Sequence, residues 1–320
     1  MNTLITGGLG YVGSHIAANL KDKAIIIDNR SNSKLNFKKN LPNCKVYIGD
    51  LNQQNLNKIF KNHKIDKVIH MASLKSVNES IIQPLKYYEN NIFSTISLLR
   101  SMDQFNINKL VFSSSATVYG GSHQSPLKEN MHLESTNPYG STKIIIENLI
   151  SDFSKYKKNF KAISLRYFNP IGSNIRYNLP EQPLGTPQNI MPVLINSIQN
   201  KRIFQIFGKN YNTKDGTCIR DYIHVQDLAD AHIKSLNSFK KINGHEIFNI
   251  GSGRGYSVLE LVRTFESVNN IKAKIIFSKR RNGDSAVSYS SIKKAKKILN
   301  WSPKFNLRKM CQDSWIAAQS

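Results

Sequence analysis

The N-terminal segment constrains the fold of this chain more than any other. Thr3 to Thr6 form a short apolar run typical of a buried strand, and a glycine-rich stretch, Gly-Gly-Leu-Gly-Tyr-Val-Gly over residues 7–13, follows at once. The spacing Gly-x-x-Gly-x-x-Gly suits a turn that binds a pyrophosphate. Gly7 would permit the tight turn, Gly10 the approach of the backbone to the anion, and Gly13 the close packing of a following helix.

A carboxylate follows this loop at the distance that dinucleotide binding requires. We expect a helix over Ser14 to Leu20, with its N-terminus pointing at the anion, and a second strand over Ala24 to Ile27 that ends in Asp28. Asp28 lies about 20 residues beyond the glycines, where a carboxylate accepts hydrogen bonds from ribose hydroxyls. Such a carboxylate favours NAD over NADP because it would repel a 2′-phosphate. The alternative is a turn residue before Asn29.

The rest of the chain alternates between strand-like and helix-like patterns. Further strand-like runs lie at 45–48, 67–70, 109–114 and 162–167, and helical patterns lie at 53–61 and 85–104. This alternation predicts an α/β protein with a doubly wound parallel Rossmann sheet. From Pro170 onward the pattern loosens, so we expect a NAD-binding domain over 1–170 and a smaller mixed α/β substrate domain over 171–320. Segments near 221–230 and 247–251 are expected to return to the main domain.

Polar residues follow the predicted strands where each strand ends. In an open α/β sheet, ligands bind outside the carboxyl ends of the strands. Each of these residues alone could be an ordinary loop residue, but together they predict one cleft. That cleft would receive Asp28, Asp50, Lys75, Ser115, Tyr139, Lys143 and Asn169.

Tyr139 and Lys143 are a candidate proton-handling pair. Residues four apart project from the same face of a helix. A phenol titrates near about 10, and a neighbouring ammonium favours the phenolate and brings its pKa toward the working range. Tyr139 could then take a proton from an alcohol or sugar hydroxyl, with Ser115 beside it. A lone Tyr-x-x-x-Lys is more often a surface pair, but the glycine loop and Asp28 favour the catalytic interpretation.

Composition bounds the class of protein. The chain has 320 residues, 40% of them hydrophobic, and no apolar run approaches the roughly 20 residues of a membrane span. The apolar stretch after Met1 is too short for a signal peptide. Cys44, Cys218 and Cys311 lie too far apart for a disulfide framework or a metal site. We therefore expect a soluble cytoplasmic protein without a membrane partner or a metal.

The net charge of +24, from 45 basic and 21 acidic residues, is unusually high. Such a charge ordinarily raises nucleic acid as a partner. The lysines are scattered through helices and loops, however, with only short groups at 155–161 and 293–297. We expect a solvated surface and no nucleic-acid partner, although a positive field would attract a nucleotide diphosphate.

Taken together, these residues resemble the extended short-chain dehydrogenase/reductases and, within them, the UDP-glucose 4-epimerase family. The resemblance covers nearly the whole chain. Residues 115–120 and 220–225 are its most discriminating parts, because the glycine loop and the Tyr-x-x-x-Lys are shared by the superfamily. The matching segments are Thr6-Gly7-Gly8, Asp28-Asn29, 70–72, 87–91, 112–120, 137–140, 165–170 and 220–225.

The resemblance implies two sets of binding residues. It implies that NAD is bound by Gly7, Gly10, Tyr11, Val12, Gly13, Asp28, Asn29, Asn32, Ser33, Asp50, Leu51, Met71, Ala72, Ser73, Lys75, Asn90, Ser115, Tyr139, Lys143 and Phe168. It implies that the UDP-sugar is bound by Ser115, Tyr139, Asn169, Asn189, Ile190, Phe207, Arg220, Tyr222, Arg281, Asp284 and Ser288. Arginines suit a diphosphate because they form bidentate, charge-assisted hydrogen bonds.

The resemblance also implies a reaction, the reversible C4 epimerisation of UDP-hexoses. Tyr139 would remove the proton of the sugar 4-hydroxyl while C4 gives hydride to NAD, and the 4-keto sugar would turn and take the hydride back. Ser115 would hydrogen-bond the reacting oxygen, and Lys143 would bind ribose hydroxyls and lower the pKa of Tyr139. NAD should stay bound between turnovers. Ala116-Thr117 stands where related 4,6-dehydratases carry Asp-Glu, which disfavours dehydration.

One position bears on the choice of sugar. Family members restricted to UDP-glucose and UDP-galactose carry a tyrosine four residues after the aspartate that corresponds to Asp284, and here that residue is Ser288. A small side chain would leave room for an N-acetyl group, which predicts additional action on UDP-GlcNAc and UDP-GalNAc. A one-residue slip that places Tyr289 in the pocket would close it.

Other functions stay open from the sequence. A UDP-hexuronate 4-epimerase would need a cationic partner for the C6 carboxylate, and a noncatalytic NAD-binding regulator or a nucleic-acid binder would not need Ser115, Tyr139 and Lys143. Members of the family commonly pair through two helices of the main domain. The corresponding helices are Leu85 to Gln104 and Tyr139 to Tyr156, and we expect a homodimer.

Overall fold

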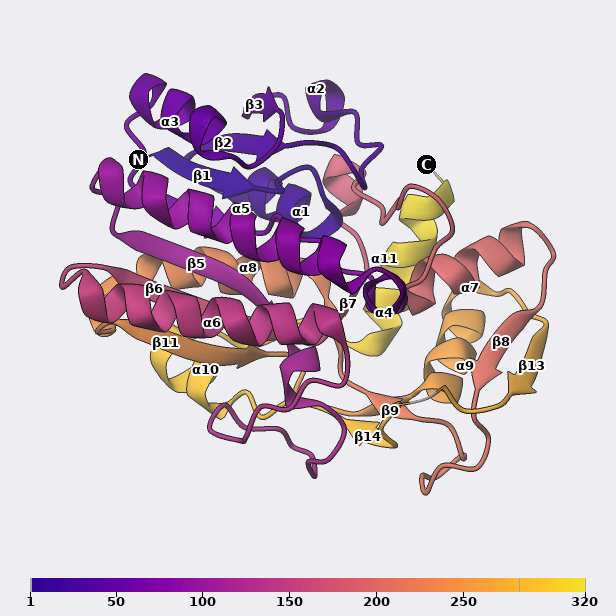
Figure 1. The fold of residues 1–320 in the computed structure, drawn as a ribbon. Coiled ribbons are helices and arrows are strands. Elements are labelled where there is room, and N and C mark those ends of the chain that lie inside the picture. Colours follow the sequence, from indigo (N-terminus) through magenta and orange to yellow (C-terminus); the bar gives the residue numbers. More distant parts are fainter. Residues whose placement is uncertain (1, 282, 320) are drawn as a thin grey trace.

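A seven-stranded parallel sheet forms the centre of the molecule (Figure 1). The computed structural model describes residues 2–281 and 283–319. The strand order is β11-β6-β5-β4-β1-β2-β3, and every neighbouring pair is parallel. The strands are β1 (Asn2–Thr6), β2 (Lys23–Asp28), β3 (Lys45–Ile48), β4 (Lys67–His70), β5 (Lys109–Ser115), β6 (Lys161–Tyr167) and β11 (His245–Ile250).

This topology confirms the predicted doubly wound α/β class. The strands predicted at residues 24–28, 45–48, 67–70, 109–114 and 162–167 agree with β2 to β6 to within one residue. The chain crosses from β3 at one edge back to β4 beside β1, so the strand order reverses between β1 and β4. Such a switch point opens a crevice at the carboxyl ends of the strands, where ligands bind in this class of fold.

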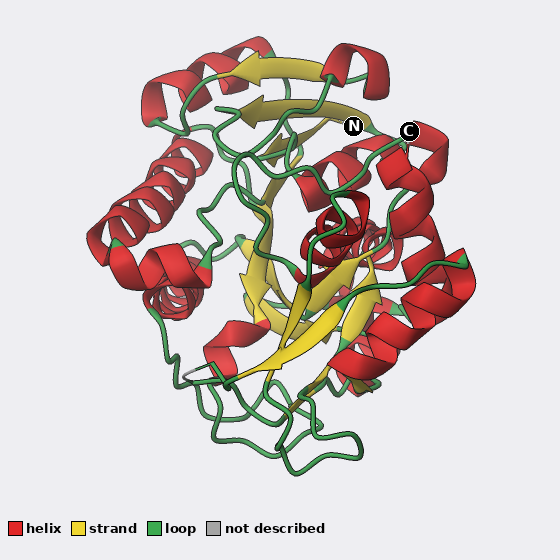
Figure 2. Cartoon of the chain, turned by 90° about the vertical axis from the view of Figure 1, so that its right-hand side faces the viewer, coloured by secondary structure: helices red, strands yellow, loops and turns green. Residues whose placement is uncertain are grey.

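Helices cover both faces of the sheet (Figure 2). Residues of α3, α5 and α6 join the buried cluster on one face, and residues of α1, α8 and α10 join the cluster on the other. None of the helices in the described part of the chain is long and apolar enough to cross a membrane. The helices of this region are α1 (Tyr11–Asn19), α2 (Phe37–Asn40), α3 (Gln53–Asn62), α4 (Val77–Ile82), α5 (Pro84–Gln104), α6 (Pro138–Tyr156), α8 (Val225–Asn237) and α10 (Lys293–Leu299).

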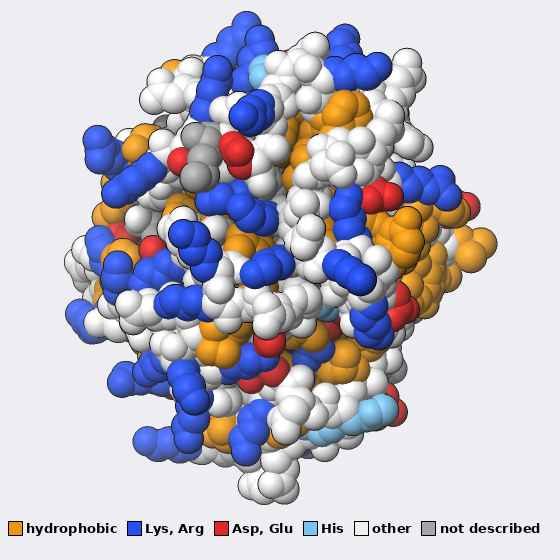
Figure 3. All heavy atoms as spheres, turned by 90° about the vertical axis from the view of Figure 1, so that its left-hand side faces the viewer, with side chains coloured by type: hydrophobic (Ala, Val, Ile, Leu, Met, Phe, Trp, Pro, Cys, Tyr) orange, Lys and Arg blue, Asp and Glu red, His pale blue; other side chains and the backbone are white. Residues whose placement is uncertain are grey.

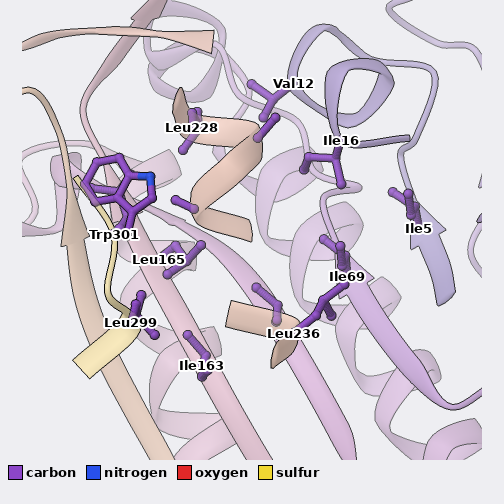
Figure 4. Close-up of a cluster of buried hydrophobic side chains, with 14 of the residues drawn as sticks. Ile5, Val12, Ile16, Ile69, Ile163, Leu165, Leu228, Leu236, Leu299 and Trp301 are labelled. Carbon is purple, nitrogen blue, oxygen red and sulfur yellow. The ribbon is translucent and has the colours of Figure 1, made fainter. Parts of the chain in front are cut away.

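The core forms because successive strand residues point to opposite faces. On β1, Leu4 joins the cluster under α3, α5 and α6, and Ile5 joins the cluster under α1 and α8. Figure 4 shows the cluster under α1 and α8, in which Leu165 of β6 lies near Trp301 and Ile163 of the same strand lies near Leu299. The Trp301 indole N–H donates to the Asp227 carbonyl at 3.0 Å, so this fully buried side chain has its polar atom paired. Each large apolar side chain buried here contributes about 1.5–3 kcal/mol.

The second half of the chain builds three small sheets beside the carboxyl edge of the main sheet, together with a separate core. Their strand orders are β10-β7, β12-β9-β14 and β13-β8. Their elements are β7 (Asn169–Ile171), α7 (Ile190–Gln199), β8 (Phe204–Phe207), β9 (Ile219–Arg220), β10 (Tyr222–His224), β12 (Tyr256–Ser257), α9 (Val258–Asn269), β13 (Ile275–Ser278), β14 (Val287–Ser288) and α11 (Leu307–Gln319).

The two segments expected to return to the main domain behave differently. Residues 247–251 largely belong to β11, which pairs with β6 at the edge of the main sheet. Residues 222–224 form β10, which pairs with β7 outside the main sheet, so a return of this strand to the main sheet is wrong. The helix that follows, α8, packs against α1 and β5 and does belong to the main layer.

Candidate active site

The glycine loop joins β1 to α1 and has the backbone conformation that its sequence predicts. Gly7 has a φ of +67°, and a Cβ there would lie 2.7 Å from the Ala72 nitrogen. A Cβ on Gly13 would collide with the Gly7 carbonyl oxygen. A Cβ on Gly10 would meet only that same oxygen, at 3.4 Å. The backbone outside Gly10 is therefore open, which fits the close approach of a pyrophosphate.

Helix α1 begins at Tyr11, three residues before the predicted start at Ser14. The first amides of a helix have no partner within the helix. Because the helix starts inside the glycine loop, these amides belong to Tyr11, Val12 and Gly13. They therefore lie in the loop predicted to hold the pyrophosphate, which strengthens the anion site.

Asp28 ends β2, as predicted, and its carboxylate is only partly used. One oxygen accepts the Leu9 N–H at 2.9 Å and the other accepts the Arg30 N–H at 2.7 Å. A carboxylate has about four acceptor positions, so Asp28 can still accept from two ribose hydroxyls. Asn29 donates to Asp50 at 2.8 Å and so joins the ends of β2 and β3.

Other predicted cofactor residues lie around the same cleft edge. The Ser33 hydroxyl donates to the Leu9 carbonyl at 2.6 Å, which ties the loop after β2 to the glycine loop. Asn32 accepts the Leu184 N–H at 3.1 Å. Leu51 lies at the end of the turn after β3 and packs against the core. These contacts bring together loops from β1, β2 and β3 at the place where an adenosine would lie in the predicted complex.

The loop after β4, which carries Met71, Ala72, Ser73 and Lys75, is held by a residue that the sequence did not single out. Asn91 accepts the Leu74 N–H at 2.8 Å and donates to the Leu74 carbonyl at 3.1 Å and to the Thr142 hydroxyl at 3.1 Å. Asn90, predicted to contact NAD, is its exposed neighbour. Both residues lie in the matching segment 87–91, but only the structure shows that Asn91 is the buried one.

Tyr139 and Lys143 occupy the first turns of α6, which is capped by Asn137 through the Gly140 N–H at 2.9 Å. Their side chains are buried, with 6% of Tyr139 and 2% of Lys143 exposed. The Lys143 Nζ lies 5.6 Å from the centre of the Tyr139 ring and donates to the Ser113 carbonyl at 2.9 Å. Ser115, at the end of β5, lies close enough to the Tyr139 phenol to lower its pKa, and its hydroxyl accepts from the Thr117 N–H at 3.3 Å and the Thr117 hydroxyl at 3.0 Å. The three predicted catalytic residues therefore meet.

Burial sets the charge state of this group. Burial raises the pKa of Tyr139 to about 12, and the nearby Ser115 hydroxyl offsets part of that rise. Burial lowers the pKa of Lys143 to about 7, while Glu147 raises it. In the protein without NAD, burial outweighs any lowering of the Tyr139 pKa by Lys143, and the predicted effect of Lys143 stays a prediction for the complex with NAD. Desolvation penalises both charges, and the ammonium bonds to a backbone carbonyl instead of the phenol.

The predicted substrate residues form two groups in the second half of the chain. Arg220 lies on β9, in register with Ser288 on β14, and pairs with Asp284 at 3.0 Å. The Arg281 guanidinium lies 4.0 Å from the centre of the Phe207 ring, a cation–π contact that orients the arginine. Each guanidinium group is thus held by a contact within the second half of the chain, and the binding of a diphosphate by the two arginines stays a prediction.

Asn189 and Ile190 lie at the start of α7, and a carboxylate connects them to the cofactor side. The Asn189 amide donates to Glu181, and Lys75 pairs with the same Glu181 oxygen at 3.5 Å. Glu181 therefore joins a predicted substrate residue to a predicted NAD residue. Its loop position between several prolines gave no signal in the sequence. Asn169 is exposed at the start of β7.

Two aromatic predictions fall on buried residues. Tyr222 is 1% exposed and packs in the core of the second half with Met191 and Leu261. Its contact with the substrate stays a prediction. Phe168 is 5% exposed and packs with Val118, and its contact with NAD stays a prediction. Within residues 2–281 and 283–319, no three His, Cys, Asp or Glu side chains are grouped to hold a metal ion.

Comparison with known proteins agrees with this geometry. The sequence profile of the NAD dependent epimerase/dehydratase family matches residues 3–251. The UDP-glucose 4-epimerase of Bacillus subtilis (strain 168) is 41% identical, over 98% of this chain and 96% of its own length.

Solved structures are also similar over the whole fold. The crystal structure of UDP-glucose-4-epimerase from Stenotrophomonas maltophila with bound NAD and formylated UDP-arabinopyranose has a TM-score of 0.96 and 36% identity, and covers 100% of this chain and 98% of that one. The UDP-Glc/GlcNAc 4-epimerase of Campylobacter jejuni has a TM-score of 0.86 and 34% identity, with 100% and 99% covered. With a glycine loop, a buried Ser-Tyr-Lys group and relatives of this similarity, the chain belongs to the NAD-dependent epimerase/dehydratase family.

Proposed function

We propose that this protein catalyses the reversible C4 epimerisation of UDP-glucose and UDP-galactose through a 4-keto intermediate, with NAD as its cofactor. One observation carries the proposal: Ser115, Tyr139 and Lys143 meet at the carboxyl edge of a sheet whose glycine loop and Asp28 fit a dinucleotide. Relatives that act as UDP-glucose 4-epimerases support the choice of reaction.

The side chains divide the chemistry between them. Tyr139 as a phenolate would take the proton from the sugar 4-hydroxyl, and Ser115 would hydrogen-bond the reacting oxygen. NAD, when bound, would supply the acceptor and donor of the hydride at C4 of the sugar. Lys143 as a cation would favour the phenolate and donate to ribose hydroxyls. Burial opposes both the Tyr139 phenolate and the Lys143 ammonium. Tyr139 would therefore act as a base only while Lys143 is protonated.

The substrate would lie across the second half of the chain. Arg220 and Arg281 suit the two phosphates through bidentate hydrogen bonds. Helix α7 begins at Ile190 and its N-terminal residue Asn189 does not cap it through a side chain, so free amides of its first turn can bind uridine or phosphate oxygens. Asn169 would contact the sugar from the end of β7.

We also infer that UDP-GlcNAc and UDP-GalNAc are substrates. Ser288 ends β14 and is in register with Arg220, whereas Tyr289 follows the strand. The Tyr289 ring lies against Gly255, where a Cβ would be 3.2 Å from Tyr289 Cδ1. This arrangement argues against the one-residue shift that would place the Tyr289 ring in the sugar pocket and close it. The Campylobacter jejuni relative, named a UDP-Glc/GlcNAc 4-epimerase, supports the same inference.

The same proposal includes the organisation of the protein. We divide it into a NAD-binding domain over 1–170 and a UDP-sugar domain over 171–320, which the separate core of the second half supports. A cytoplasmic location is supported by three free cysteines, Cys44, Cys218 and Cys311. A homodimer is supported by large exposed apolar side chains on α4 and α5, among them Ile82, Leu85 and Phe93. The relatives do not favour a UDP-hexuronate 4-epimerase or a noncatalytic binder.

The decisive experiment uses the purified protein with UDP-glucose or UDP-galactose and no added cofactor. We expect both substrates to reach the same mixture of the two sugars, and denatured protein to release NAD. In the Tyr139→Phe variant, NAD should stay bound while kcat falls at least about a hundredfold, since loss of a general base costs on the order of 10²–10⁴. A protein that carries no dinucleotide and leaves both sugars unchanged, even with NAD supplied, would refute the proposal.

A further inference from the structure

Lys143 is a buried amine that needs a counter-charge nearby to stay protonated. Its ammonium is bonded to the Ser113 carbonyl, a neutral group, and its side chain is almost fully buried. Burying an ammonium without an anionic partner is strongly unfavourable. One turn further along α6 stands Glu147, also buried, and residues four apart on a helix are neighbours on the same face. Glu147 thus lies on the same side of the helix as the catalytic lysine.

The contacts of Glu147 reach the strand that carries Ser115. The Ser114 hydroxyl donates to one Glu147 oxygen at 2.5 Å, while the preceding residue, Ser113, accepts from Lys143. Two successive turns of α6 therefore hold two successive residues of β5, directly before Ser115. A shift of Glu147 would move the end of β5, and with it the hydroxyl that faces Tyr139.

Other groups around Lys143 do not supply a negative charge. From α6 itself there is Tyr139, and from β5 the Phe112 ring, 4.9 Å from the ammonium. From β4 there is His70, whose pKa burial lowers to about 3, and beside Ser113 there is His232, whose pKa burial lowers to about 4. Both imidazoles are neutral at physiological pH. Among these groups, the anion that supports Lys143 is Glu147.

We propose, on the basis of the proposed function, that Glu147 is a positioning residue of the epimerase reaction. Its carboxylate keeps the Lys143 ammonium charged and fixes the end of β5 that presents Ser115. Loss of the carboxylate lowers the pH at which Lys143 loses its proton, because Glu147 raises the pKa of this buried amine. The cation that favours the Tyr139 phenolate would then be missing over part of the working pH range.

A purely structural role is the competing explanation. Arg166 donates to Glu147 through Nε at 3.0 Å and Nη2 at 2.6 Å, and both side chains are about 2% exposed. Glu147 could therefore serve only as the counter-ion of Arg166, which also donates to Tyr119 at 3.1 Å. Removing one member of a buried pair destabilises a protein strongly, whereas removing both is far better tolerated.

Two variants separate these explanations, because both lose the ion pair and they differ in the carboxylate. Arg166→Met keeps Glu147, and the double variant Glu147→Gln with Arg166→Met lacks it. We expect Arg166→Met to retain the alkaline limb of the wild-type kcat profile for UDP-galactose. In the double variant this limb should move down by about one pH unit, so that kcat at the former midpoint falls severalfold while KM stays within about twofold. If the two profiles coincide, the inference is wrong.

Glu147→Asp provides a second measurement if either Arg166→Met or the double variant does not fold. This variant keeps the charge on a shorter side chain, so the alkaline limb should stay at the wild-type pH while kcat falls, since Ser114 loses its fixed partner. An alkaline limb that moves although the charge is kept would also overturn the inference. Wild-type protein is assayed in parallel. If it leaves UDP-galactose unchanged, the proposed function has failed; if it turns over, the variants test Glu147 alone.

Discussion

Tyr139, Lys143 and His70 lie in one buried region. Burial shifts the pKa of each side chain in the direction that favours its neutral form. The sequence indicated that Tyr139 and Lys143 would be close, because four-residue spacing on a helix brings side chains together. Their contacts were not predictable, since the Ser113 carbonyl that accepts from Lys143 becomes its neighbour only when β5 and α6 pack. A spacing argument therefore finds the pair but not its protonation state.

The buried histidines predict how stability depends on pH. Burial lowers the pKa of His15, His232 and His245 to about 4 and of His70 to about 3. Unfolded histidine titrates near about 6.5, so between pH 6.5 and 4 the unfolded chain binds more protons than the folded one. Stability is therefore full above pH 6.5 and is lost as the pH falls.

Urea unfolding at pH 7 and at pH 5 measures this effect. Each histidine should remove about 1.4 kcal/mol of unfolding free energy per pH unit below 6.5. His245→Gln, which keeps a polar partner for Ser164 but does not titrate, should reduce the slope by one histidine's share. Equal unfolding free energies at the two pH values would contradict the assignment of neutral, buried imidazoles.

At the scale of elements, the glycine loop makes a prediction that separates folding from cofactor binding. A Cβ on Gly13 would collide with the backbone of Gly7 and Gly8, whereas a Cβ on Gly10 has room within the protein. We expect Gly13→Ala to lower the melting temperature and lose NAD. Gly10→Ala should melt like the wild-type protein without its cofactor yet retain little NAD, because the added methyl occupies the space left for the pyrophosphate.

Melting curves and the amount of NAD released on denaturation check both variants. The Gly10→Ala protein is the more informative variant, because a folding defect cannot explain its loss of NAD. A Gly10→Ala protein that keeps wild-type NAD content would show that the pyrophosphate lies elsewhere.

The elements predicted from the sequence were mainly those of the main sheet. Buried parallel strands are short continuous apolar runs, and β2 to β6 were located on that signal. The pairing of strands could not be predicted in this way, because tertiary contacts decide which strands become neighbours. The segment at 222–224 was recognised as a strand, but its partner β7 was not. Tyr222 was placed at the substrate by the family resemblance, and nothing in the local sequence shows that its ring packs in the core of the second half.

Strand β14 gives the prediction about the sugar. Ser288→Tyr would place a bulky ring beside Arg220, on the side where an N-acetyl group is expected. Turnover of UDP-GlcNAc should fall at least about a hundredfold, on the order of the cost of a clash in a specificity pocket, while turnover of UDP-glucose stays within a few fold. Tyr289→Ser is the matched control, because this ring packs on Gly255, and it should leave the ratio of the two activities unchanged.

Assays of both substrate pairs decide the matter. If the wild-type protein converts the N-acetylated sugars more than about a thousandfold more slowly than UDP-glucose, the open-pocket inference fails before any variant is made.

At the scale of the whole molecule, two surface properties oppose each other. The net charge of +24 makes copies of the chain repel one another, and Figure 3 shows Lys and Arg side chains spread over one face without a single dense patch. On α4 and α5, by contrast, Ile82, Leu85 and Phe93 are 78%, 75% and 63% exposed. These two helices pack beside α6, so the apolar side chains lie on adjoining helices. Apolar clusters of this kind mark interfaces.

The repulsion makes the proposed dimer dependent on salt, and this gives the last prediction. Light scattering after size exclusion should show a dimer at 0.15 M salt, where charges further apart than about 8 Å are screened, and partial dissociation at low salt. Phe93→Lys should yield a folded monomer, because it puts a charge into the apolar contact. Ile48→Lys, at a residue that is 56% exposed on the edge strand β3, should remain dimeric. A wild-type monomer at micromolar concentration, or equal behaviour of the two variants, would rule out α5 as the interface.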